Sequence, residues 1–144
     1  MLRNSMSVEF MAISDNERFA RSVAAAFVIG LDPTMEEISE IKTAISEAVT
    51  NAIIHGYNDS GQGRIVMEGI IYEDTVEFRV SDEGVGISDI RRAREPLYTG
   101  KPEDERSGMG FTIMETFMDS VEVESEKNKG TSIIMTKTIK QVGK

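Results

Sequence analysis

Three polar residues of the segment 46–57, SEAVTNAIIHGY, could act together on one ligand. Glu47, Asn51 and His55 are spaced four residues apart, so on an α-helix each lies about 40° round from the last and the three form one stripe. A carboxylate can act as a base, and an amide oxygen suits a hard metal ion. Acidic and amide residues at this spacing are also common on solvated helices, so other motifs must decide between the two interpretations.

A second carboxylate, Asp82, directly follows a strand pattern in which residues 76, 78 and 80 are apolar. Strand parity places Asp82 on the same inward face as those residues. Burying a carboxylate is costly unless a donor reaches it, and the amino group of adenine is a donor of suitable size. Gly84 and Gly86 would let the backbone turn sharply and pass close to the base. The alternative is a plain acidic turn between strands.

Two further glycine motifs point to an anion and to the same inward layer. Gly108 and Gly110 precede a predicted helix, whose free amides and positive dipole end favour an anion such as a triphosphate. Their spacing is not that of a Walker or Rossmann loop, and glycine before a helix is often only a turn. Thr131 follows Gly130 and shares strand parity with residues 133 and 135, so its hydroxyl is expected to face the layer of Asp82.

Apolar periodicity predicts the first elements that would position these residues. The alternation at Val8, Phe10 and Ala12 predicts a strand, and Ser14 with Glu17 predicts a capping box that opens a first helix. We expect Gly30 to stop that helix and a second helix to begin at Asp32 and Pro33. The predicted buried residues of the two helices are Phe19, Val23, Ala24, Phe27, Met35, Ile38, Ile41, Ile45, Ala48 and Ala52.

The second half of the chain predicts a sheet and a third helix. A turn at 58–63 leads to a strand near 64–72, which is expected to form a hairpin with the strand at 76–80. Residues 88–106 lose the apolar period and gather cations, prolines and a glycine, which predicts a mobile lid. A helix from Gly110 and strands around 121–123 and 133–135 follow. The whole predicts an α+β fold, a two-layer sandwich in which three main helices cover one face of a mixed, mostly antiparallel sheet.

Composition excludes several classes of function. The 144 residues suffice for one domain with a real core. The 25 acidic and 16 basic residues give a net charge of −9, which would repel nucleic acid. With no Cys and one His, thiolate chemistry and histidine-rich metal sites are excluded, so any metal needs oxygen ligands. No apolar run suffices for a membrane helix or signal peptide, so we expect a cytoplasmic protein without membrane contact.

Four short motifs occur in the order of a known superfamily. Glu47-x-x-x-Asn51, Asp82-x-Gly84-x-Gly86, Gly108-x-Gly110 and Gly130-Thr131 resemble the N, G1, G2 and G3 boxes of Bergerat-type ATPases. The segments SEAVTNAIIHGY at 46–57, SDEGVGI at 81–87 and ERSGMGFTIMETFMDSVEVES at 105–125 resemble the anti-sigma serine kinases of that superfamily. The resemblance implies a single ATP-binding kinase domain over residues 1–144, with the lid at about 88–106.

The resemblance also implies a role for each box. Asn51 is the expected Mg²⁺ ligand, Glu47 the general base and Asp82 the partner of adenine. Because phosphoryl transfer spreads negative charge over the transferred group, either Lys101 or Arg106 is expected to clamp the γ-phosphate. The expected contacts of ATP or ADP are Asn51, His55, Asp82, Gly84, Gly86, Ile87, Lys101, Arg106, Ser107, Gly108, Met109, Gly110, Phe111 and Thr131.

By resemblance, the chain is expected to phosphorylate a serine of an anti-anti-sigma protein and separately to bind and inhibit a sporulation sigma factor. The residues themselves indicate only an ATP and Mg²⁺ site with a base. One alternative is a non-catalytic switch, in which ATP or ADP orders the lid and selects the protein partner. A hydrolytic ATPase, as in the clamp domains of larger relatives, is a third hypothesis, which the short chain disfavours.

The expected protein contacts involve the first helix and the first strand. Arg18 and Arg21 lie opposite the predicted apolar stripe of the helix, where they could meet an acidic sigma segment. The alternative is that these arginines only solubilise the helix. Members of the resembled family are typically dimers, so we expect a homodimer formed through the first strand and helix.

Overall fold

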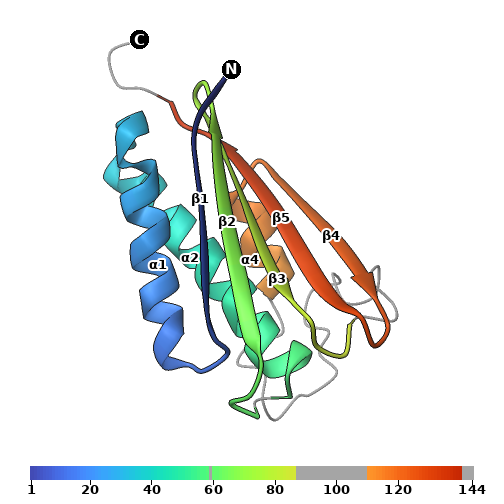
Figure 1. Ribbon diagram of the computed structural model, residues 1–144. Helices are drawn as coiled ribbons and strands as arrows, with labels where there is room; N and C mark the ends of the chain where they lie inside the picture. The colour runs from blue at the N-terminus through green and yellow to red at the C-terminus, as the bar shows by residue number, and fades with distance from the viewer. Residues whose placement is uncertain (59, 87–109, 141–144) are drawn as a thin grey trace.

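A computed structural model describes residues 1–58, 60–86 and 110–140 (Figure 1). The elements are β1 Leu2–Met11, α1 Asp15–Val28, the 3₁₀ turn η1 Ile29–Leu31, α2 Met35–Asn51, the π-helical turn η2 Ala52–Gly56, β2 Arg64–Tyr72, β3 Thr75–Asp82, α4 Gly110–Phe117, β4 Ser120–Glu126 and β5 Gly130–Thr138. The predicted lid at 88–106 lies outside the described residues. None of the helices found in the described ranges is long and apolar enough to cross a lipid bilayer.

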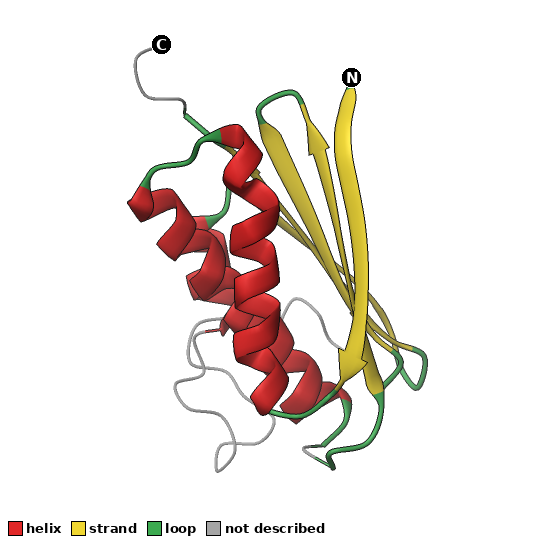
Figure 2. Ribbon diagram, turned by 60° about the vertical axis from the view of Figure 1, so that its left-hand side comes forward, coloured by secondary structure: helices red, strands yellow, loops and turns green. Residues whose placement is uncertain are grey.

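The described elements form two layers. The strands make one five-stranded sheet in the order β1-β2-β3-β5-β4, and every pairing among them is antiparallel. The helices all lie on one face of that sheet, as Figure 2 shows. The predicted α+β class is therefore confirmed, as is the predicted hairpin, which β2 and β3 form.

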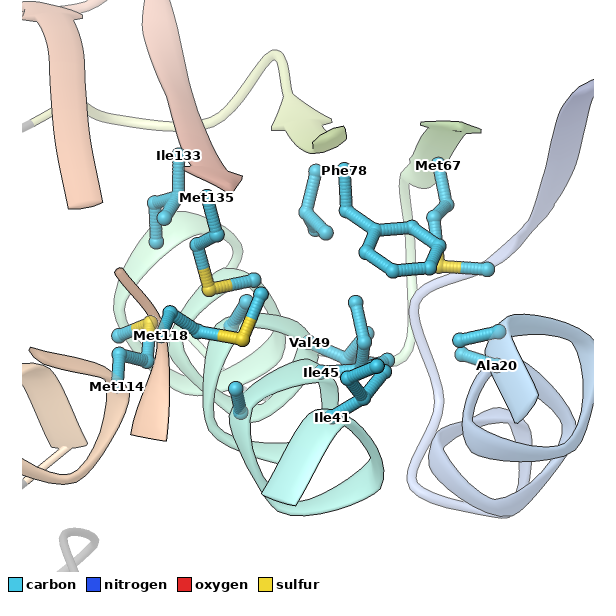
Figure 3. Close-up of a cluster of buried hydrophobic side chains, with 14 of the residues drawn as sticks. Ala20, Ile41, Ile45, Val49, Met67, Phe78, Met114, Met118, Ile133 and Met135 are labelled. Atoms are coloured by element: carbon cyan, nitrogen blue, oxygen red, sulfur yellow. The ribbon is translucent and has the colours of Figure 1, made fainter. Parts of the chain in front are cut away.

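The core fills the space between the helices and the sheet. On β3, residues 76, 78, 80 and 82 are buried and their neighbours are half-buried, so the strand alternates as predicted. Ile41, Ile45 and Val49 of α2 point toward Phe78 in the sheet (Figure 3), and all four are fully buried. Burying each such side chain stabilises the fold by roughly 1.5–3 kcal/mol. This packing fixes α2, which carries Glu47 and Asn51, above the centre of the sheet.

The first helix differs from the prediction at its start and in its buried face. Ser14 makes no capping hydrogen bond, and Glu17 instead accepts hydrogen bonds from the hydroxyls of Ser46 and Thr50 on α2. Phe19 is 44% exposed rather than buried. The buried row consists of Ala20, Ala24 and Val28. Small side chains on this row let α1 lie close to its neighbours, which the apolar pattern alone did not reveal.

The second helix begins later than predicted. Asp32 has a left-handed φ of 53° and ends η1, so it does not start a helix. The capping box occurs at Thr34 and Glu37, where each side chain accepts a hydrogen bond from the other's backbone amide. Met35, predicted to be buried, is the first residue of α2 and is 81% exposed. Gly30 lies inside η1 and is not the terminating residue.

Candidate nucleotide site

Asp82 lies at the end of β3 with its side chain in the helix-facing layer, as strand parity predicted. It is 8% exposed and is paired across the sheet with Thr131 of β5, so the two side chains lie on the same face. The carboxylate accepts a hydrogen bond from the backbone amide of Gly84 at 2.9 Å. Burial raises the pKa of Asp82 above its usual range, although the amides of Gly84 and Thr131 oppose that rise.

Gly56 packs directly behind the carboxylate of Asp82. A Cβ on Gly56 would lie 2.9 Å from both Cγ and Oδ1 of Asp82. A Cβ on Gly84 would lie 1.9 Å from the carbonyl oxygen of Gly56, which accepts a hydrogen bond from the amide of Val85 at 2.9 Å. Gly84 is thus needed, as predicted, for a close backbone approach. The approach is to the end of the α2 segment, however, and Gly56 was not predicted at all.

Tyr57 links the loop after β3, residues 83–86, to the start of strand β2. Its hydroxyl accepts a hydrogen bond from the amide of Glu83 at 2.7 Å and donates one to the carbonyl of Arg64 at 2.7 Å. A Cβ on Gly63 would lie 2.5 Å from the Tyr57 ring, so the ring lies flat against the turn before β2. Sequence reasoning missed Tyr57 because neither partner is near it in sequence.

Two glycines with positive φ close the other side of the loop. Gly86 has φ +76°, and a Cβ on it would lie 2.1 Å from the carbonyl oxygen of Glu126. Gly130 has φ +96°, and a Cβ on it would lie 2.1 Å from the carbonyl oxygen of Asp82. Both positions need glycine because other residues rarely adopt this φ and have no room here. The loop is therefore fixed against the β4–β5 turn.

A cavity of about 370 Å³ lies beside Asp82 at the end of the sheet. Thr131 also lines it, with residues 124–126, 129–130 and 132. The hydroxyl of Thr131 lies 2.7 Å from that of Ser125, so a hydrogen bond joins the two. A buried carboxylate and a neighbouring hydroxyl at a cavity can accept from and donate to a heterocycle such as adenine.

Glu47 and α4 come together at the same end of the molecule. A Cβ on Gly110, the first residue of α4, would lie 3.3 Å from Oε2 of Glu47. Asn51 is the last residue of α2 and, like Glu47, is half-buried. A base, an amide oxygen and a helix N-terminus that favours anions are therefore neighbours. Phe111, in contrast, is 6% exposed and packs into the core, so only its backbone could contact a phosphate.

His55 does not continue the predicted stripe. The α-helix ends at Asn51, and residues 52–56 form a π-helical turn in which the amide of Tyr57 donates to the carbonyl of Ala52. Because an i→i+5 turn holds more residues per revolution, the 40° progression assumed for a regular helix stops after Asn51. His55 is half-buried in that turn.

The remaining predicted residues fall into two groups. Arg21 lines a groove of about 440 Å³ between α1 and α2, and Glu47 of the candidate site lines the same groove. Outside the described residues lie Ile87, Lys101, Arg106, Ser107, Gly108 and Met109.

Comparison with known families covers nearly the whole chain. The sequence pattern of the histidine kinase-like ATPase domain matches residues 11–137. The anti-sigma F factor of Clostridium perfringens strain SM101 is 61% identical over 134 residues, which cover 93% of this chain and 96% of that protein. Those of Geobacillus kaustophilus and Oceanobacillus iheyensis are 61% and 57% identical over 138 residues, which cover 96% of this chain and 94% of each protein.

Solved structures share the fold at much lower identity. A chain containing the RsbU and RsbW domains of a Mycobacterium tuberculosis protein aligns with a TM-score of 0.67 and 18% identity. The alignment covers 95% of this chain and 32% of that longer chain. The catalytic domain of the histidine kinase ThkA aligns with a TM-score of 0.58 and 17% identity, over 93% of this chain and 96% of that one. Similarity at this level shows a common fold.

Proposed function

We propose that this chain, which belongs to the histidine kinase-like ATPase family and within it to the anti-sigma F factors, uses ATP to phosphorylate a serine of an anti-anti-sigma protein. It also binds a sporulation sigma factor and keeps it from RNA polymerase. Residues 1–144 act as one kinase domain, with a lid at 88–106. Because ATP and sigma factors act in the cytoplasm, the chain works there.

The observation that supports catalysis is the closeness of Glu47 to Gly110, the first residue of α4, where an added Cβ would lie 3.3 Å from Oε2 of Glu47. In the proposed reaction Glu47 removes the proton from the serine hydroxyl, whose oxygen attacks the γ-phosphorus while ADP leaves. The amides at the start of α4 hold the phosphates beside this base. At the adenine end of ATP, Asp82 accepts a hydrogen bond from the amino group of the base, and the Thr131 hydroxyl lies beside it as a further polar group.

Asn51 is suited to hold the magnesium ion that such a transfer requires. Its amide supplies a hard oxygen one helical turn from Glu47, and its side chain is half-buried rather than fully covered. No cluster of three or more acidic, His or Cys side chains suited to a metal occurs within the residues that the structure describes. Mg²⁺ does not need one, because it usually binds one or two protein ligands together with phosphates and water. The ion neutralises charge on the phosphates.

The kinase proposal is tested by transfer of label from ATP to a purified anti-anti-sigma protein. Glu47→Ala should slow transfer by about 10²–10⁴-fold, the usual contribution of a general base. Glu36→Ala, on the exposed first turn of the same helix, is the matched control and should transfer at the parent rate. Equal rates for Glu47→Ala and the parent would refute the base assignment. Nucleotide-dependent partner binding without any transfer by the parent would identify a non-catalytic switch.

Sigma binding is proposed at the α1–α2 groove. Arg18 is exposed on α1, and Arg21 lines the groove with its Nε buried and without a hydrogen-bond partner among the described residues. An acidic segment in the groove would pair with the guanidinium group of Arg21. Arg21→Glu should weaken sigma binding by at least about tenfold through charge reversal, whereas Lys127→Glu on an exposed turn should not. Unchanged affinity for Arg21→Glu contradicts the proposal.

A homodimer is proposed through β1 and α1. The strand β1 lies at the sheet edge and is ten residues long, with most of its side chains exposed. Such an edge carries unpaired backbone groups that a second copy could cover. Sedimentation of the purified chain should give the dimer mass, and a monomer at all accessible concentrations contradicts this.

A further inference from the structure

Lys137 is a buried cation in the row of β5 side chains that faces the helices. Its neighbours in this row are Ile133, Met135 and Ile139, and Lys137 itself is only 8% exposed. Lysine is rarely buried unless it is paired, because its ammonium group loses hydration. Its Nζ donates to the carbonyl oxygen of Phe117 at 2.6 Å and lies 3.4 Å from Oε1 of Glu40.

These two partners belong to different helices. Phe117 is the last residue of α4, where backbone carbonyls lack partners within the helix and where a cation is favourable. Glu40 belongs to α2. Asp119 also holds this end of the molecule together, since its amide donates to the carbonyl of Thr136 and its carboxylate accepts from the amide of Thr138. Those bonds join the segment after α4 to β5, whereas Lys137 also reaches α2.

The other end of α4 also contacts α2, at Glu47 beside Gly110. Glu40 and Glu47 are seven residues apart, which is about 10.5 Å along a helix, and the eight residues of α4 span about 12 Å. The helix α4 therefore runs antiparallel to α2, with its start close to Glu47 and its end linked to Glu40 through Lys137. Loosening the Lys137 end would tilt α4 and displace Gly110 relative to Glu47.

We propose that Lys137 is a positioning residue for phosphoryl transfer, which sets the distance between the start of α4 and the carboxylate of Glu47. The inference rests on the proposed kinase function, because it assigns the start of α4 to the phosphates. Lys137 touches neither substrate, and it acts through α4. The adenine end is held by β3 and β5 and does not depend on it.

The test compares Lys137→Met, which keeps the length of the side chain, with Lys140→Met, whose side chain is exposed. Transfer to the anti-anti-sigma protein is measured well below the melting temperature and expressed per folded molecule. For Lys137→Met we expect kcat to fall by about 10- to 100-fold and the KM for ATP to change less, since misplacement by about 1 Å can cost that much. Lys137→Arg should recover most of the loss, and Lys140→Met should behave like the parent.

A lower melting temperature with unchanged kcat would show a structural role alone and overturn the inference. If Lys137→Met does not fold, Glu40→Gln provides the second test, because it removes the charge and keeps an acceptor. Its kcat should fall by about threefold, and an unchanged kcat overturns the inference. If the parent itself transfers no phosphate, the kinase proposal fails and the inference, which rests on it, fails too. If the parent transfers phosphate and Lys137→Met has the same kcat, only the inference is overturned.

Discussion

The buried carboxylates at the two ends of the helix–sheet interface have pKa values shifted in opposite directions. At the end near the start of α2, Glu37 accepts hydrogen bonds from the amides of Thr34 and Lys140, and Lys137 is paired with Glu40. At the other end, Asp82 is as deeply buried as Glu37. The bonds to Glu37 outweigh the effect of burial and lower its pKa, whereas burial prevails at Asp82 and raises its pKa.

This difference separates a structural end from the end that carries the candidate nucleotide site, here called the functional end. Buried polar groups whose partners offset the cost of burial stabilise a fold, whereas a buried carboxylate whose donors do not offset that cost reduces stability until a ligand supplies a further donor. Carboxylates with a raised pKa beside a cavity are candidates for binding sites for the same reason. We therefore expect substitutions near Asp82 to act mainly on nucleotide affinity, and substitutions near Glu37 mainly on the free energy of unfolding.

The largest effect is expected at Gly84, where nucleotide affinity and the free energy of unfolding should both fall. In Gly84→Ala the new Cβ would lie 1.9 Å from the carbonyl oxygen of Gly56, so the loop must move away from η2. We expect ATP affinity to fall at least about 100-fold and the free energy of unfolding to fall by about 2–4 kcal/mol. Calorimetry and urea unfolding measure the two quantities.

Gly30→Ala is the matched control for the alanine substitution itself. No atom lies within 4 Å of its new Cβ, so stability should stay equal or rise by up to about 1 kcal/mol, with unchanged ATP affinity. Tight ATP binding by Gly84→Ala would show that the contact with Gly56 does not shape the site.

Asp82→Asn should separate affinity from stability. The variant loses a charged acceptor for the adenine amino group, so ATP affinity should fall by about 10- to 100-fold. It also removes the buried charge and keeps an oxygen that can accept from the Gly84 amide, whereas the Thr131 amide loses its acceptor. Because the lost bond offsets the removal of the buried charge, the free energy of unfolding without nucleotide should stay within about 1 kcal/mol of that of the parent. A clear loss of stability would show that Asp82 has a structural role.

Glu37→Gln should have the converse effect. The two carboxylate oxygens of Glu37 each accept from a backbone amide, and an amide side chain offers only one oxygen. One amide, of Thr34 or Lys140, would then face an NH₂ group. We expect the free energy of unfolding to fall by about 1–2 kcal/mol and ATP affinity to stay within about twofold. Glu36→Gln, at the exposed neighbouring position, should change neither quantity, and reduced ATP affinity in Glu37→Gln would contradict the division.

At the functional end, local sequence rules predicted the orientation of individual residues better than the contacts between them. Strand parity placed Asp82 and Thr131 on one face because alternation depends only on the chain itself. The π-helical turn that redirects His55 has no signature in hydrophobic periodicity. Gly56 and Tyr57 were missed because their partners, Asp82, Glu83 and Arg64, become neighbours only when β2 and β3 pack beside the end of the helical segment.

The same limit applied to the structural end of the molecule. Strand parity with residues 133 and 135 places Lys137 on the inward face, but lysine is rarely buried, so its burial was not predicted from the sequence. Its partners, Glu40 and Phe117, become neighbours only when α2 and α4 pack on β5. Thr34 and Glu37 have the spacing of a capping box, but the Asp-Pro pair just before them gave an earlier helix start that also agreed with helix-start preferences.

The smallest predicted effect concerns the pH dependence of the free energy of unfolding, to which the two buried carboxylates contribute with opposite signs. The pKa of Asp82 in the folded protein lies above its ordinary value of 3.8, so between these two values the folded state holds more protons than the unfolded state. Stability should therefore fall as pH rises through that window. The pKa of Glu37 lies below its ordinary value of 4.5, so its contribution is present above 4.5 and is lost as pH falls through the folded value.

Urea unfolding without nucleotide, at steps between about pH 3.5 and 7, measures both contributions as differences between the parent and each variant. With rising pH the parent should lose stability relative to Asp82→Asn and gain it relative to Glu37→Gln. Taking differences removes the titration of the other carboxylates, which the parent and variants share. If the two difference curves had slopes of the same sign, the pKa values of both carboxylates would be shifted in the same direction. The division between a structural and a functional end would then fail.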